Sequence, residues 1–162
     1  MAKAQLIVDE LKKLKITHVV GLPDNGSRAL YELLAHDAEI EVVSVCREGE
    51  AFAIASGLYV GGKRPAALIQ NTGFLESGDG FRGTAYNMAI PLVTLIGYRG
   101  YETMGKERED SAATFLEPTL KAWNIPYYML HGDDDVGVIS KAFEKAEETS
   151  MPTAVVISRE CT

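Results

Sequence analysis

The sequence predicts one α/β domain, built on a doubly wound sheet of about six mainly parallel strands with helices on both faces. Short apolar runs of strand length alternate with amphipathic helical patterns along the whole chain. Several of the runs are continuously apolar, as expected for parallel strands that are covered on both faces. A length of 162 residues suits one domain with a sizeable core. We therefore expect a single domain over residues 1–162.

Six runs have the length and composition of strands, and we expect them at residues 16–21, 40–45, 66–70, 92–97, 127–130 and 153–158. Helical spacing of apolar residues fills the segments between them, as with Ile7, Leu11 and Leu14 before the first strand. Prolines stand just ahead of four strands, where they mark the connections from helix to strand: Pro65, Pro91, Pro126 and Pro152. The strict alternation of strand and helix predicts the doubly wound topology.

Composition excludes several classes of function. The net charge is −7 and no basic patch occurs, which argues against a nucleic-acid partner. Apolar stretches such as residues 91–96 are too short to cross a bilayer, and the first residues lack the apolar core of a signal peptide. The two cysteines, Cys46 and Cys161, have neither metal-ligand spacing nor a disulfide framework. We expect a cytoplasmic protein with no membrane partner.

Four polar, glycine-rich loops follow the carboxyl ends of predicted strands, at residues 22–27, 46–49, 71–80 and 98–102. The third and fourth are also long. In doubly wound sheets, ligands bind at this edge, in the loops that lead from strand to helix. The sequence therefore predicts a functional site there.

Glu48 lies where the second predicted strand gives way to a helix expected from about residue 47 to residue 61, rich in alanine and glycine. A carboxylate in the first turn of a helix is often only structural, because it meets the positive end of the helix dipole. Ala51, Phe52 and Ala55 follow at three, four and seven residues, so Glu48 shares their expected buried face. Position alone leaves a structural and a functional role open.

Glu48 followed nine residues later by Gly57, in a helix of small residues, resembles the pyrimidine-binding (PYR) domain of thiamine diphosphate enzymes. In that family the matching glutamate hydrogen-bonds N1′ of the aminopyrimidine and favours the imino tautomer, which removes the C2 proton of the thiazolium. The resemblance implies that Glu48 is catalytic and binds the cofactor. Glu50 does not match the nine-residue spacing.

Further motifs resemble the phosphonopyruvate and sulfopyruvate decarboxylases of this family. Residues 70–73 resemble their Gln-Asn-Ser-Gly loop, residues 95–100 their strand ending in Arg-Gly, and residues 21–25 their Gly-Val-Pro turn. Without the resemblance, residues 70–80 are a strand-to-helix loop and residues 23–27 a turn that caps the next helix. The resemblance implies two sets of contacts, to the cofactor from Pro23, Asn71, Thr72, Gly73 and Phe74, and to the substrate from Asp24, Asn25, Gln70 and Arg99.

The motif that binds the diphosphate has no convincing counterpart. Gly78-Asp79-Gly80 resembles it in letters only, because no strand immediately precedes it and no asparagine follows about 25 residues later, near Lys106. We therefore expect no metal ligand in this chain. The resemblance implies a separate diphosphate-binding (PP domain, beta) subunit that holds thiamine diphosphate through Mg²⁺, in a hetero-oligomer with two or more copies of each chain.

These resemblances imply the pyrimidine-binding (alpha) subunit of a two-subunit, thiamine diphosphate-dependent 2-oxo acid decarboxylase acting on a small anionic 2-oxo acid. The histidines His18, His36 and His131 lie outside the four loops, and the Asp-Glu-Pro-Gln-His pattern of the phosphonopyruvate enzymes is missing. Two alternatives therefore stay open, a thiamine-dependent carboligase subunit and a non-catalytic doubly wound assembly or ligand-binding module. No Gly-x-Gly-x-x-Gly follows the first strand, which disfavours a nucleotide-binding module.

Overall fold

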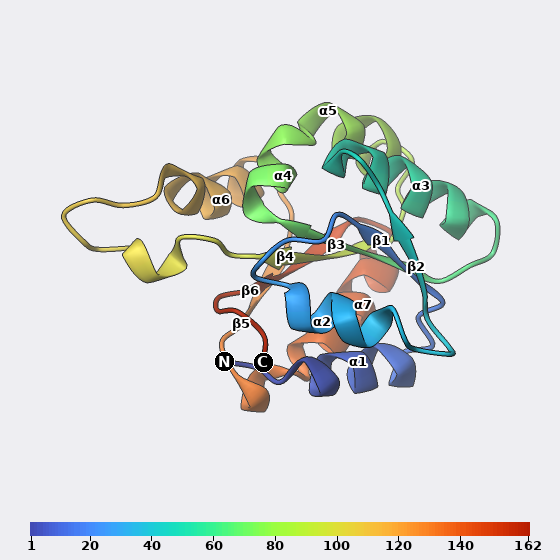
Figure 1. Ribbon diagram of the computed structural model, residues 1–162. Helices are drawn as coiled ribbons and strands as arrows, with labels where there is room; N and C mark the ends of the chain where they lie inside the picture. Colours follow the sequence, from blue (N-terminus) through green and yellow to red (C-terminus); the bar gives the residue numbers. More distant parts are fainter.

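The six predicted strands form a single sheet in the computed structural model, which describes residues 1–162 (Figure 1). Every neighbouring pair is parallel, and the strand order is β2-β1-β3-β4-β6-β5. The prediction of a doubly wound parallel sheet is confirmed, with each strand end within two residues of its expected position. The strands are β1 (His18–Gly21), β2 (Glu41–Ser44), β3 (Pro65–Gln70), β4 (Val93–Gly97), β5 (Tyr127–Leu130) and β6 (Thr153–Ile157).

Helices cover both faces of the sheet, with α1, α2 and α7 on one face and α3 to α6 on the other (Figure 1). The α-helices are α1 (Ala4–Lys13), α2 (Arg28–Leu34), α3 (Glu48–Val60), α4 (Asn71–Glu76), α5 (Gly78–Gly80), α6 (Ser111–Ala122) and α7 (Val138–Thr149). The π-helix η1 (Phe81–Tyr86) continues from α5, and two short 3₁₀-helices complete the set, η2 (Tyr101–Thr103) and η3 (Asp133–Asp135).

Alternate side chains of the strands enter two separate cores, which explains why the strands are continuously apolar. In β1, Val19 packs under α1, α2 and α7, whereas Val20 packs under α3 to α6. Leu68 and Ile69 of β3 divide in the same way between the two cores. Burial on both faces leaves few positions for polar side chains within the central strands, with Thr94 of β4 as an exception, so polar side chains are concentrated at the sheet edge.

The segment 71–80, predicted as a loop, is largely helical. Phe74 and Phe81 are fully buried against Phe52 of α3, with ring centroids 6.3 Å and 5.2 Å from that of Phe52. Two phenylalanines seven residues apart face the same side only if the chain between them winds as a helix. Gly80 allows the close approach, because a Cβ atom there would lie 2.8 Å from the carbonyl oxygen of Gly49. The polar composition of the segment concealed this packing.

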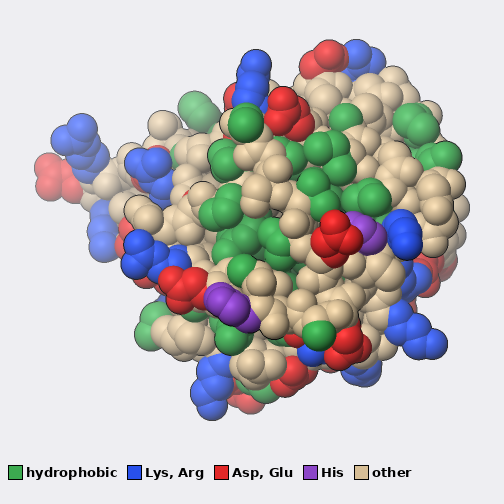
Figure 2. All heavy atoms as spheres, turned by 45° about the vertical axis from the view of Figure 1, so that its right-hand side comes forward, with side chains coloured by type: hydrophobic (Ala, Val, Ile, Leu, Met, Phe, Trp, Pro, Cys, Tyr) green, Lys and Arg blue, Asp and Glu red, His purple; other side chains and the backbone are tan.

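Hydrophobic side chains also reach the surface. Figure 2 shows them gathered in the middle of one face, with charged side chains around them. Ile54, Tyr59 and Val60 of α3 are exposed, and no charged residue follows Glu50 in this helix. None of the helices combines the length and the apolar composition that a membrane span requires.

Candidate active site

Glu48 is the first residue of α3, and its neighbour Glu50 holds the start of that helix. Arg47 precedes the helix in an extended conformation. The Glu50 carboxylate accepts hydrogen bonds from the backbone N–H groups of Cys46 and Arg47, at 3.1 Å and 3.3 Å. This contact satisfies N–H groups that would otherwise lack a partner at the helix N-terminus. Glu50 is therefore a structural carboxylate, and Glu48 is left free of this task.

Glu48 lies directly against the backbone of α4. A Cβ atom at Gly73 would overlap the Cγ, Cδ and Oε1 atoms of Glu48, so only glycine allows the two segments to meet in this way. Glu76 of α4 is paired with Arg47, whereas Glu48 is half-buried and takes part in no salt bridge or side-chain hydrogen bond of the chain. A half-buried carboxylate without a partner is suited to bind a ligand group that can share its proton.

Tyr31 of α2 connects the ends of β1 and β3. Its hydroxyl donates a hydrogen bond of 2.7 Å to the carbonyl oxygen of Leu68, over the position of Gly21, where a Cβ atom would overlap that oxygen. Burial raises the pKa of Tyr31, and the negative charges of Asp24 and Glu48 raise it further. The two carboxylates, from the loops after β1 and β2, therefore lie at the same edge of the sheet.

Asp24 organises the loop after β1 and also reaches β3. Its Oδ1 accepts hydrogen bonds from the backbone N–H groups of Gly26 and Ser27 at 2.7 Å and 3.2 Å, and its Oδ2 accepts one from the Ser27 hydroxyl at 2.6 Å. Gln70 Nε2 donates to Asp24 Oδ1 at 3.3 Å, and the Thr72 hydroxyl donates to Gln70 Oε1 at 2.8 Å. A continuous set of hydrogen bonds thus joins the ends of β1 and β3.

The side chains of Asn71 and Phe74, which were predicted to contact the cofactor, are fully buried. Asn71 Nδ2 donates to the carbonyl oxygens of Arg99 and Ala112, both at 3.0 Å, and its Oδ1 accepts from the backbone N–H of Thr72. Phe74 packs among three other aromatic rings. Only the backbone of these two residues is therefore available at the site edge, and their role toward a cofactor stays a prediction. Pro23 is exposed in the loop after β1.

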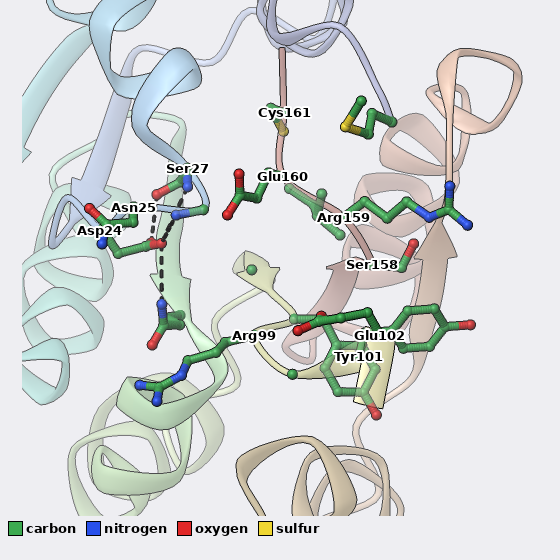
Figure 3. A pocket seen from close by; sticks show the side chains of 17 residues that line it. Asp24, Asn25, Ser27, Arg99, Tyr101, Glu102, Ser158, Arg159, Glu160 and Cys161 are labelled. Atoms are coloured by element: carbon green, nitrogen blue, oxygen red, sulfur yellow. Dashed lines mark hydrogen bonds between the residues drawn. The ribbon is translucent and has the colours of Figure 1, made fainter. Parts of the chain in front are cut away.

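A cavity of about 810 Å³ lies over the carboxyl ends of β1, β3, β4 and β6 (Figure 3). All four residues predicted to contact substrate line it, namely Asp24, Asn25, Gln70 and Arg99, whereas Glu48, Thr72 and Gly73 lie outside its lining. The opposite wall consists of Tyr101 and Glu102, which belong to a predicted loop, and of Ser158, Arg159, Glu160 and Cys161, which were not predicted at the site. The end of the sixth predicted strand was a usable signal for part of that wall, since every parallel strand ends at this edge.

Arg99 is the cation of the cavity that is best suited to meet an anion. Its side chain is 61% exposed, and its Nε lies 3.5 Å from Asp110, a distance too long for a strong charge-assisted hydrogen bond. Figure 3 shows Arg99 beside the wall that carries Asp24, while Arg159 points away on the other side. The guanidinium of Arg99 therefore remains available to a carboxylate.

The segment Gly78–Gly80 forms the short helix α5 rather than a binding loop. Asp79 is exposed and pairs with Arg82 at 2.6 Å. The chain brings together no group of three or more His, Cys, Asp or Glu side chains that could hold a metal ion.

The sheet order and the unpaired carboxylate at the start of the helix after β2 agree with the expected resemblance to a pyrimidine-binding domain. The chain belongs to the thiamine pyrophosphate enzyme family, since residues 1–122 match its N-terminal TPP binding domain. The predicted membership in the thiamine diphosphate enzymes is thereby confirmed.

Two relatives and one solved structure give the similarity more detail. Sulfopyruvate decarboxylase subunit alpha of Methanocaldococcus jannaschii is 29% identical over 122 residues, which cover 75% of this chain and 72% of the relative. Sulfopyruvate decarboxylase of Methanosarcina acetivorans is 22% identical over 152 residues, 94% of this chain but 39% of the relative. Benzoylformate decarboxylase from Polynucleobacter necessarius has the same fold, with a TM-score of 0.78 at 22% identity. All of this chain matches 31% of that structure, so it spans about a third of its length.

Proposed function

We propose that this chain is the pyrimidine-binding (alpha) subunit of a thiamine diphosphate-dependent 2-oxo acid decarboxylase, whose active site is shared with a separate diphosphate-binding subunit. The observation that carries the proposal is the Glu48 carboxylate, half-buried against Gly73 and without a partner in the chain. The similarity to the alpha subunit of a sulfopyruvate decarboxylase supports the reaction class.

The residues present fit the aminopyrimidine ring of the cofactor. Glu48 offers one oxygen to a ring nitrogen and can hold or share a proton there. The missing side chain at Gly73 leaves the carboxylate in place beside the backbone of the β3–α4 junction, which together with the Pro23 loop would hold the ring. When bound, the cofactor supplies the electron sink for the loss of carbon dioxide. The contribution of this chain is therefore to place one carboxylate and to exclude water around it.

The proposal includes a separate diphosphate-binding subunit because a similar relative is itself a subunit alpha. Relatives occur both as a subunit of which this chain covers 72% and as a longer chain of which it covers 39%. We infer that the missing part, with its Mg²⁺, is supplied by a partner in a hetero-oligomer containing two or more copies of each chain. The exposed Ile54, Tyr59 and Val60 lie on the helix that Glu48 begins, where such a partner would pack.

The substrate of this proposal is a small anionic 2-oxo acid that enters the 810 Å³ cavity. Arg99 would pair with its carboxylate, since a guanidinium can donate two parallel hydrogen bonds to that group. Asn25 is exposed next to Asp24 and lines the same cavity. Which 2-oxo acid is bound depends on both subunits.

Native purification of the tagged chain, followed by sequencing of its partner, tests this proposal. We expect a partner that carries a Gly-Asp-Gly motif with an asparagine about 25 residues later. The reconstituted pair should release carbon dioxide from a 2-oxo acid only with thiamine diphosphate and Mg²⁺. A chain that forms only homo-oligomers, or a pair that keeps full turnover with Glu48→Gln, would contradict it.

A further inference from the structure

We propose that Asp24 and Thr72 are positioning residues that fix the side-chain amide of Gln70 in one orientation, with one N–H directed at the substrate cavity. The inference rests on the proposed function, because the acceptor for this N–H is an oxygen of the 2-oxo acid. It adds a defined donor to the site, and it assigns Asp24 and Thr72 a role different from direct contact with ligands.

One of the two neighbours, Asp24, determines which way the amide faces. The Asp24 carboxylate only accepts hydrogen bonds, so the NH₂ group of Gln70 must be the end that meets it, at 3.3 Å. The other end, Oε1, accepts from the Thr72 hydroxyl at 2.8 Å. A rotated amide would place its oxygen against the carboxylate and lose that hydrogen bond, because the carboxylate cannot donate. The Asp24 carboxylate therefore sets the orientation, and the Thr72 hydroxyl holds the other end of the amide in place.

This arrangement leaves one N–H of Gln70 without a partner in the chain. The NH₂ group has two hydrogens and Asp24 accepts one of them. Gln70 is half-buried and lines the cavity, so the second N–H is accessible to a bound acid. A fixed donor loses little conformational entropy when it binds, in contrast to a mobile surface side chain. A neutral amide also keeps the same proton count across the physiological pH range.

Both positioning residues are themselves held firmly. Asp24 is anchored by three hydrogen bonds within its own loop. Thr72 lies in the first turn of α4, next to the Gly73 backbone that contacts Glu48. The substrate donor and the cofactor-facing carboxylate are therefore placed by the same short helix, which sets their relative position.

The test compares Thr72→Val with Thr72→Ser in the reconstituted complex. Valine keeps the shape but removes the hydroxyl, and we expect kcat/KM for the 2-oxo acid to fall about 3- to 10-fold, the effect of one hydrogen bond. Serine keeps the hydroxyl donor, so kcat/KM of Thr72→Ser should fall less than about twofold. In a Gln70→Ala background, Thr72→Val should have no further effect on kcat/KM. Additive losses from Thr72→Val and Gln70→Ala would overturn the inference while leaving the proposed function intact.

A second measurement does not depend on turnover. In ¹⁵N relaxation measurements on the full chain, the Gln70 side-chain NH₂ should have a high order parameter, which falls in Thr72→Val but not in the control Thr114→Val. The Thr114 hydroxyl bonds only to the carbonyl oxygen of Ser111, away from the cavity. An unchanged Gln70 order parameter in Thr72→Val would refute the fixed orientation, whereas a lack of turnover in the wild-type complex would refute the proposed function.

Discussion

The two sides of the same sheet edge differ in how firmly their polar groups are held. On the β1–β2–β3 side, Glu48 lies against Gly73 and Gln70 is held from both ends. On the β4–β6 side, Arg99 is 61% exposed with one weak partner, and Glu160 is exposed. The difference indicates a division of work, with proton chemistry on the fixed side and adaptable recognition of charge on the other. Substitutions on the two sides should differ accordingly in kind and size.

The largest effect is expected from Glu48→Gln. The amide cannot exchange a proton with the cofactor ring, so kcat of the reconstituted complex should fall at least about 100-fold, with assembly and thermal stability unchanged. Glu50→Gln is the matched control, because its amide oxygen can still accept from the N–H groups of Cys46 and Arg47. Equal activities of the two variants would remove the distinction between these carboxylates.

Gly73→Ala should have the next largest effect. The added methyl group would overlap the Glu48 side chain and displace it, so we expect kcat to fall about 10- to 100-fold and stability by about 1–3 kcal/mol. Gly83→Ala serves as control, since nothing lies within 4 Å of a Cβ atom there, and it should add about 0.5–1 kcal/mol of stability in urea unfolding. Full activity of Gly73→Ala would show that Glu48 needs no fixed position.

Arg99→Gln tests the adaptable side. Loss of one largely exposed charge should raise KM for the 2-oxo acid about 3- to 10-fold and leave kcat nearly unchanged, because the interaction binds ground state and transition state alike. The control is Arg82→Gln, which removes an exposed pair with Asp79 outside the cavity. If Arg99→Gln lowered kcat as strongly as Glu48→Gln, the two sides of the sheet edge would not differ in their role in catalysis.

The two cysteines lie on the two sides of the sheet edge, and their alkylation compares how accessible those sides are. Cys46 is exposed before α3, whereas Cys161 is buried in the cavity wall. Burial, together with the charge of Asp24, raises the pKa of the Cys161 thiol to about 11. Because the thiolate is the reactive form, iodoacetamide at about pH 8 should label Cys46 in the isolated chain and leave Cys161 largely unmodified, as read by mass spectrometry. Labelling of Cys161 should rise as the pH approaches 11, and rapid labelling at pH 8 would show an open wall.

The sequence was sufficient for the sheet but not for the contacts at its edge. Apolar runs identified all six strands, and the runs are continuous where both faces are buried, whereas the edge strands β2 and β5 are partly exposed. The helical form of residues 71–80 was missed, since it depends on the burial of Phe74 and Phe81 against a distant helix. Composition and local spacing do not encode such partners.

The same limit applies to the site. The position of Glu48 at a helix start is visible in the sequence, but its contact with Gly73 joins two different strand-to-helix junctions. Asn71 resembled a ligand contact in the sequence, whereas the structure shows its amide bonded to the carbonyl oxygens of Arg99 and Ala112. The end of the sixth predicted strand was a signal for residues 158–161, but the sequence alone did not assign them to the cavity wall.

The most direct test of the role of Glu48 is the rate at which the C2 proton of bound thiamine diphosphate exchanges with deuterium in the reconstituted complex, followed by quenched NMR. We expect Glu48→Gln to slow this exchange at least about 100-fold, while Glu50→Gln leaves it unchanged. Equal exchange rates in the wild-type and Glu48→Gln complexes, with the cofactor bound in both, would contradict the assignment of Glu48 as the carboxylate that activates the cofactor.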